Sequence, residues 1–156
     1  MEPDGMLNLT VKLDFDEFPE VYTCKGANRS PPIRVEGALA NIKSFAVLAT
    51  TSPEEGPSRV AWVLWNLPAV PLIPEGFPPE KEVESPLHAL QGMNDFGTIG
   101  YRGPCPSPGQ TEAYLFRVYA FDLDLPLDPG ATWEDLVRAM DRSMNQTGEA
   151  IAFATG

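Results

Sequence analysis

Histidine, cysteine and basic residues are scarce in this chain, and each scarcity excludes a class of function. The 156 residues include one histidine, two cysteines, and 11 Lys and Arg against 22 Asp and Glu, for a net charge of −11. Phosphate contacts need Lys and Arg, so we expect neither nucleic acid nor an anionic membrane surface as a partner. Without a C-x-x-C pair and with one histidine, an ordinary structural zinc site is excluded. We expect no metal and no cofactor.

Long hydrophobic runs are also missing. No segment approaches the length of a membrane span, and the first residues, MEPDGM, lack the pattern of a signal peptide. We therefore expect one cytoplasmic domain, residues 1–156, large enough to bury a core. Because thiols stay reduced in the cytoplasm, Cys24 and Cys105 are predicted to be free.

What the chain does contain is strand patterning broken by proline and glycine. Hydrophobic residues alternate from Leu7 to Phe15, and three later runs have strand composition: 44–50, 59–68 and 112–125. No helical pattern separates them, which indicates an antiparallel sandwich or barrel. In the second of these runs the odd spacing of Trp62 and Trp65 predicts opposite faces.

Two segments depart from this pattern. One helix is predicted after Thr132, which can cap it together with Asp135. Its apolar face has helical spacing: Trp133, Leu136, Val137, Met140 and Met144. Gly148 is expected to stop it before a last strand, 149–155. The polar, proline-rich stretch 68–92 is interpreted as a surface loop long enough to be functional, with His88 as an ordinary exposed residue.

Several stretches resemble the phosphatidylethanolamine-binding protein family, in its bacterial and archaeal branch that is often labelled Raf-kinase-inhibitor-like. The most specific is GMNDFGTIGYRGPCPSPG at 92–109. Four shorter ones agree in order and spacing: YTCKGANRSPP, SFAVLATTSPEEGP, VAWVLWNLPA and LPLDPGAT. The similarity extends from about residue 7 to the C-terminus.

This resemblance implies a mainly β fold: a two-sheet antiparallel sandwich with Greek-key connections and a helix near the C-terminus. It also implies a small pocket at one end of the sandwich, which in the family binds phosphate-like anions. The Gly-Pro stretch with Gly103 and Pro104 resembles one wall of that pocket. Glycine lets backbone N–H groups approach a ligand, and proline stiffens the wall.

The pocket positions themselves depart from the family. The Asp-Pro-Asp-like segment reads Ser52-Pro53-Glu54, the first pocket histidine is Ala61, and the His-Arg-Tyr stretch reads Glu112-Ala113-Tyr114. Only Tyr114 is retained, so both imidazole donors are lost and a carboxylate replaces one of them.

This exchange acts against an anionic ligand. An ionised Glu112 at about 4 Å from an anion costs on the order of 4 kcal/mol at an effective dielectric of about 20, roughly three decades of affinity. Arg59 is expected on the face of Ala61, where it can fill the vacated volume and pair with Glu54 or Glu112, whereas Arg117 faces the other side. The alternative is that Glu54 and Glu112 are solvated rim residues without a binding role.

Three functions stay open. The first is a non-enzymatic binding protein whose pocket has changed from phosphate to a small neutral or cationic ligand. The second is an interaction or inhibitor module, kinase- or protease-inhibitor-like as in the family, with the pocket rim and 68–92 as its contact surface and a vestigial pocket. The third, an enzyme using Glu112 as base, lacks an activated nucleophile. We also expect a homodimer, by resemblance to bacterial relatives.

Overall fold

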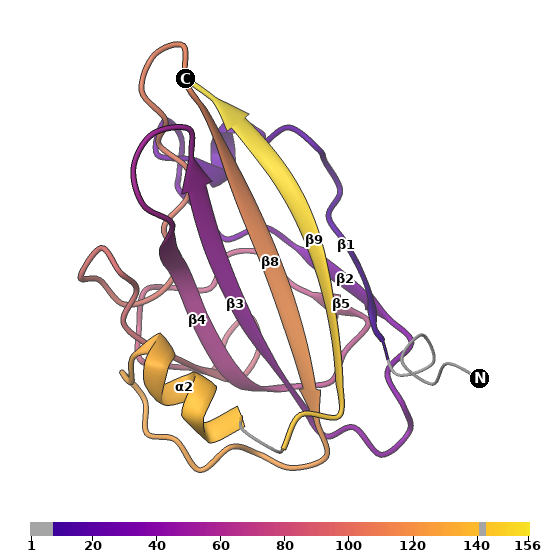
Figure 1. Cartoon of the computed structure of the whole chain (residues 1–156). Coiled ribbons are helices and arrows are strands. Elements are labelled where there is room, and N and C mark those ends of the chain that lie inside the picture. The colour runs from indigo at the N-terminus through magenta and orange to yellow at the C-terminus, as the bar shows by residue number, and fades with distance from the viewer. Residues whose placement is uncertain (1–7, 141–142) are drawn as a thin grey trace.

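Two antiparallel β-sheets packed face to face form the chain, with one helix outside them (Figure 1). The computed structural model describes residues 8–140 and 143–156. The small sheet has the order β1-β2-β5 and the large sheet the order β6-β7-β4-β3-β8-β9. The strands are β1 Thr10–Lys12, β2 Ile33–Glu36, β3 Ser44–Pro53, β4 Arg59–Pro68, β5 Leu72–Ile73, β6 Glu82–Val83, β7 Ala89–Gln91, β8 Thr111–Phe121 and β9 Gln146–Thr155, and the helices are the 3-10 helix η1 Glu20–Tyr22 and α2 Trp133–Met140. This arrangement confirms the predicted sandwich.

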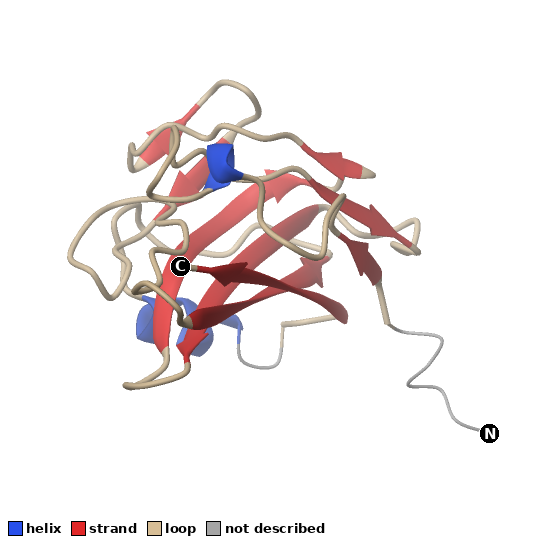
Figure 2. Cartoon of the chain, turned by 90° about the horizontal axis from the view of Figure 1, so that it is seen from above, coloured by secondary structure: helices blue, strands red, loops and turns tan. Residues whose placement is uncertain are grey.

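The central strands of the large sheet are buried on both faces, because the small sheet covers one face and α2 covers the other. One core cluster fills the space between the sheets and includes Trp62, while the other lies between the large sheet and α2 and includes Trp65. The two indoles therefore lie on opposite faces of β4, as predicted. Figure 2 shows α2 and η1 on opposite sides of the large sheet.

Strand β8 carries the alternation that positions the site. Glu112, Tyr114 and Phe116 are buried on its inner face. Arg117 is exposed and its Nε lies 3.3 Å from a carboxylate oxygen of Glu149 on β9. The prediction that Glu112 and Arg117 face opposite sides is confirmed.

The ends of two predicted elements are corrected. The N-terminal strand covers only Thr10–Lys12, and Leu7 lies outside the described residues. The capping box at α2 is present, because the Asp135 N–H donates to the Thr132 hydroxyl and the Thr132 N–H to the Asp135 carboxylate. The described part of the helix covers Trp133–Met140, and Met144 lies outside the helix, after a turn at Ser143.

Gly148 does not stop a helix, because it lies inside β9. A Cβ at this position would lie 2.4 Å from the backbone oxygen of Leu9. The glycine is needed there because the segment before β1 passes directly beside β9, where the Leu9 N–H donates to the Thr147 carbonyl.

The stretch 68–92 is not a surface loop. It contains β5, β6 and β7, and Phe77, Val83 and Gln91 are buried. The Gln91 side chain accepts a hydrogen bond from the Trp62 indole and donates to the carbonyls of Pro78 and Glu80. These hydrogen bonds of the buried Gln91 side chain hold the segment against the core. His88 is exposed, as expected.

No helix within the described ranges is long and apolar enough to cross a membrane.

Candidate functional site

A β-bulge places Ala61, which the sequence predicted to stand at a pocket position. In the β3–β4 pairing Ala49 faces Trp62 and Thr50 faces Val60, so Ala61 is the extra residue. Bulges redirect side chains beside sites. Here the Ala61 carbonyl accepts the Arg102 N–H at 3.0 Å, and its methyl group is fully buried in the interior core. Ala61 is a packing residue that ties the wall loop to β4.

Glu112 is the buried carboxylate of this end of the sandwich. It lies at the start of β8, opposite Pro53 of β3, and is 9 % exposed. One carboxylate oxygen accepts the hydroxyl of Thr51, and the other accepts the backbone N–H of Cys105 at 3.1 Å. The alternative of a solvated rim residue is therefore wrong for Glu112.

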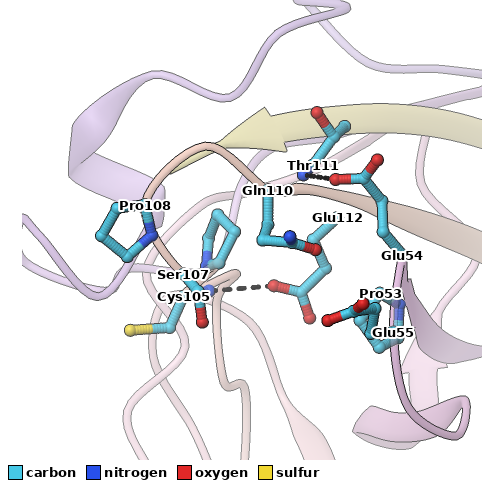
Figure 3. A pocket seen from close by; sticks show the side chains of 10 residues that line it. Pro53, Glu54, Glu55, Cys105, Ser107, Pro108, Gln110, Thr111 and Glu112 are labelled. Atoms are coloured by element: carbon cyan, nitrogen blue, oxygen red, sulfur yellow. Dashed lines mark hydrogen bonds between the residues drawn. The ribbon is translucent and has the colours of Figure 1, made fainter.

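A cavity of about 270 Å³ opens beside Glu112, and we call it the site cavity (Figure 3). Its charged lining residues are Glu54, Glu55 and Glu112. The other seven lining residues are uncharged, three of them prolines, and none of the ten is Lys, Arg or His. Three carboxylates without a lining cation make this space favourable for positive charge and unfavourable for anions.

Arg59 lines a neighbouring cavity of about 240 Å³, which also borders Glu55 and Glu112. Its guanidinium lies over the ring of Phe96, 5.5 Å from the centroid. The expected pairing with Glu54 or Glu112 is wrong, because none of the ion pairs among the described residues includes Arg59. Arg59 therefore neutralises neither carboxylate.

The Gly-Pro wall is held by close backbone packing. A Cβ on Gly103 would lie 2.1 Å from the carbonyl oxygen of Tyr22, and the Gly103 N–H donates to Asn28. The Tyr101 hydroxyl donates to the same Tyr22 carbonyl at 2.8 Å. Only glycine permits this approach, so Gly103 has a structural role and does not line either cavity.

Tyr114 is hydrogen-bonded to the backbone of the wall. Its hydroxyl donates to the Arg102 carbonyl at 2.7 Å. Burial, and after it the Glu112 carboxylate, raises the pKa of Tyr114 well above its ordinary value. The hydroxyl therefore stays protonated and donates its hydrogen bond to the wall. Tyr114 lines neither cavity.

The prediction of free thiols is wrong. Cys24 and Cys105 form a disulfide, with their Cα atoms 5.3 Å apart and a sequence separation of 81. The physical reason is the fold: the Cys24 N–H donates to the Pro104 carbonyl at 3.2 Å, which brings the loop after η1 against the wall.

The remaining predicted site residues lie at the edges of the site. The Ser52 hydroxyl is exposed, lies 3.1 Å from that of Ser58, and borders neither cavity. Pro104 is buried and lines a separate cavity together with Cys24. The sequence reasoning missed Thr51 and Glu55. Thr51 lies two positions from Pro53 on the strand, which was the available signal for a side chain facing Glu112.

The comparisons with known proteins agree with this architecture. The family model described as phosphatidylethanolamine-binding protein matches residues 10–153. A UPF0098 protein of Pyrococcus abyssi is 46% identical over 152 residues, which cover 96% of this chain and 85% of that protein. A UPF0098 protein of Pyrococcus horikoshii is 42% identical over 140 residues, covering 88% and 71%.

Two solved structures have the same fold. A putative phosphatidylethanolamine-binding protein homolog from Chlamydia trachomatis, CT736, aligns with a TM-score of 0.79 at 27% identity, over 94% of this chain and 97% of that chain. YbcL of E. coli, described as a member of the mammalian PEBP family, aligns with a TM-score of 0.80 at 24% identity, over 96% and 99%. The chain therefore belongs to the phosphatidylethanolamine-binding protein family.

Proposed function

We propose that this chain is a non-enzymatic binding protein whose site cavity takes a small organic cation, such as a primary ammonium group, and rejects phosphate. One observation carries the proposal: Glu54, Glu55 and Glu112 line the site cavity and no basic residue does. A buried carboxylate such as Glu112 is satisfied best by a donor that also carries positive charge. Phosphate would bring a like charge into the same space.

An organic cation suits the cavity better than a metal ion. In the part of the chain that the structure describes, no three His, Cys, Asp or Glu side chains are placed to hold a metal together. The three carboxylates instead line a space of about 270 Å³, which is large enough for an alkylammonium group. The two hydrogen bonds that occupy Glu112 also favour a binding role over that of a general base.

The change Glu112→Gln tests the proposal. Glutamine keeps the size of the side chain and can still bond Thr51 and Cys105, so the fold should persist. We expect the affinity for ethylammonium to fall at least tenfold, because an interaction of about 4 kcal/mol at close range is removed. Phosphate affinity should rise for the same reason. Calorimetric titration of both variants with ethylammonium and phosphate measures both effects.

A matched control is Glu82→Gln, which removes one negative charge from an exposed side chain of β6, four strands away from β8 in the large sheet and outside the site cavity. It should leave both affinities within about twofold of the parent, since exposed charges beyond about 10 Å are screened at 0.1 M salt. If the parent binds phosphate more tightly than ethylammonium, the proposed ligand class is wrong.

A second candidate function is protein–protein interaction through the outer face of β8 and β9. Ile151 is 51% exposed and Phe153 42%, and they lie opposite Leu115 and Ala113 of β8. This face replaces the 68–92 stretch as the candidate contact surface, because that stretch is packed against the core. The partner that we propose for it is a second copy of the chain.

Light scattering of parent and Ile151→Ser/Phe153→Ser protein tests the second candidate. We expect the parent to have about twice the mass of one 17.0 kDa chain at tens of micromolar, and the variant that of a single chain. Leu72→Ser is the control, because Leu72 is similarly exposed but lies on the small sheet. A parent that stays at 17.0 kDa over the whole concentration range rules out the homodimer.

The cytoplasmic location expected from the sequence is part of the same proposal. In that compartment the exposed Cys24–Cys105 bridge meets glutathione and thioredoxin-type reductants. Cell fractionation followed by immunoblotting checks the location.

A further inference from the structure

The Cys24–Cys105 disulfide lies beside the site cavity and is open to solvent from two sides. Cys105 lines the site cavity, and Cys24 lines a second cavity of about 130 Å³. Both cysteines are exposed. In Figure 3 the backbone nitrogen of Cys105 faces the Glu112 carboxylate, while its sulfur points away from it. A thiol can therefore reach the bridge without entering the core.

Backbone hydrogen bonds hold both ends of the wall around this bridge, but few hold its middle. The Pro104 carbonyl accepts the Cys24 N–H at 3.2 Å, and the Gly109 N–H donates to the Gly156 carbonyl at 3.3 Å. Pro104, Pro106 and Pro108 have no N–H, so only Cys105 and Ser107 provide donors between them. The Cys105 N–H donates to Glu112, and the Ser107 carbonyl accepts the Gln110 N–H within the loop itself. The disulfide is the covalent tie that holds this wall against the loop after η1.

We propose that the redox state of the disulfide controls binding at the site cavity. A dithiol reductant would break the bond between the wall and the loop after η1, and this would lower the affinity for the cation. The inference rests on the proposed function, since it concerns regulation of the same cavity. In the oxidised state the tie holds the Cys105 N–H on Glu112 and keeps the carboxylate directed at the cavity. In the reduced state the middle of the wall, from Cys105 to Pro108, can move away, and Glu112 loses one of its two partners.

The exchange is a balanced two-electron reaction with a dithiol, small or carried by a protein. A thiolate of the reductant attacks Cys24 Sγ, a mixed disulfide forms, and the Cys24–Cys105 bond breaks. Cys105 leaves as a thiolate and takes up a proton. The second thiolate of the reductant then attacks its own sulfur in the mixed disulfide, Cys24 leaves and is protonated, and the reductant departs as a disulfide.

The test compares the full chain oxidised and after treatment with dithiothreitol, with mass spectrometry to show the gain of two hydrogen atoms. Calorimetric titration with ethylammonium should give an affinity at least tenfold weaker for the reduced protein, and reoxidation should restore it. Cys24→Ser/Cys105→Ser should bind as weakly as the reduced parent and ignore dithiothreitol. Equal affinities in the two redox states of the parent would overturn the proposal.

Amide hydrogen exchange separates this inference from the proposed function, because it needs no ligand. On reduction the protection of the Cys105 amide should fall at least tenfold, whereas that of Val47 in the core of β3 should fall much less. Unchanged protection at Cys105 would refute the release of the wall on reduction, even if ethylammonium binds. Loss of protection at both amides would refute it as well, since a switch needs a folded reduced state. Exchange as expected without any ethylammonium binding would instead refute only the proposed ligand.

Discussion

Gly103→Ala is expected to lower the free energy of unfolding by about 3 kcal/mol or more, because overpacking against backbone cannot be relieved by rotating a side chain. The new Cβ would lie 2.1 Å from the Tyr22 carbonyl oxygen and 2.6 Å from the Asn28 amide oxygen. Either the wall or the loop after η1 has to move, and the bond from the Gly103 N–H to Asn28 is then lost. Urea denaturation of the oxidised protein measures the change.

Gly109→Ala is the matched control for this prediction. Gly109 is in the same wall and has a φ of +78°, but nothing lies within 4 Å of a Cβ built on it. The change therefore adds only left-handed backbone strain, about 1–2 kcal/mol. Equal losses of stability for the two variants would show that Gly103 is not in close contact with Tyr22.

Gln91→Leu is expected to have an effect of similar size. It leaves the Trp62 indole N–H and the carbonyls of Pro78 and Glu80 without their buried partner. Each stranded group costs about 1–3 kcal/mol, so the free energy of unfolding should fall by roughly 3 kcal/mol or more in sum. The same denaturation experiment, followed by tryptophan fluorescence, reports it.

Gln110→Leu makes the same chemical change at a half-buried position where no hydrogen bond of the side chain is found among the described residues. It should alter stability by no more than about 0.5 kcal/mol. If Gln91→Leu were as mild as this control, the segment 68–92 would be a surface loop after all, as the sequence alone suggested.

The parts of the fold that the sequence predicted are those with a strong local pattern. The run 59–68 coincides with β4, because a continuous apolar stretch bounded by proline indicates a strand that is buried on both faces. The odd spacing along β8 was enough to predict that Glu112 and Arg117 face opposite sides, but it did not decide which of them faces inward. The segment 92–109 carried the family resemblance, and with it the location of the site.

The parts that the sequence missed depend on contacts between distant segments. Strands β5 and β6 have two residues each and no alternation to detect; they exist because β2 and β7 provide their partners. The disulfide joins residues 81 apart. The position of Arg59 over Phe96 depends on the turn made by 94–100, which no spacing within β4 reveals.

The most direct test of the central claim follows two backbone amides by NMR during titration of the oxidised protein. The Cys105 N–H is bonded to Glu112 and the Thr111 N–H to Glu54, so both report on carboxylates of the site cavity. The account predicts that ethylammonium shifts both resonances in a saturable manner, and that phosphate at the same concentrations shifts neither. Saturable shifts with phosphate, and none with ethylammonium, would contradict it.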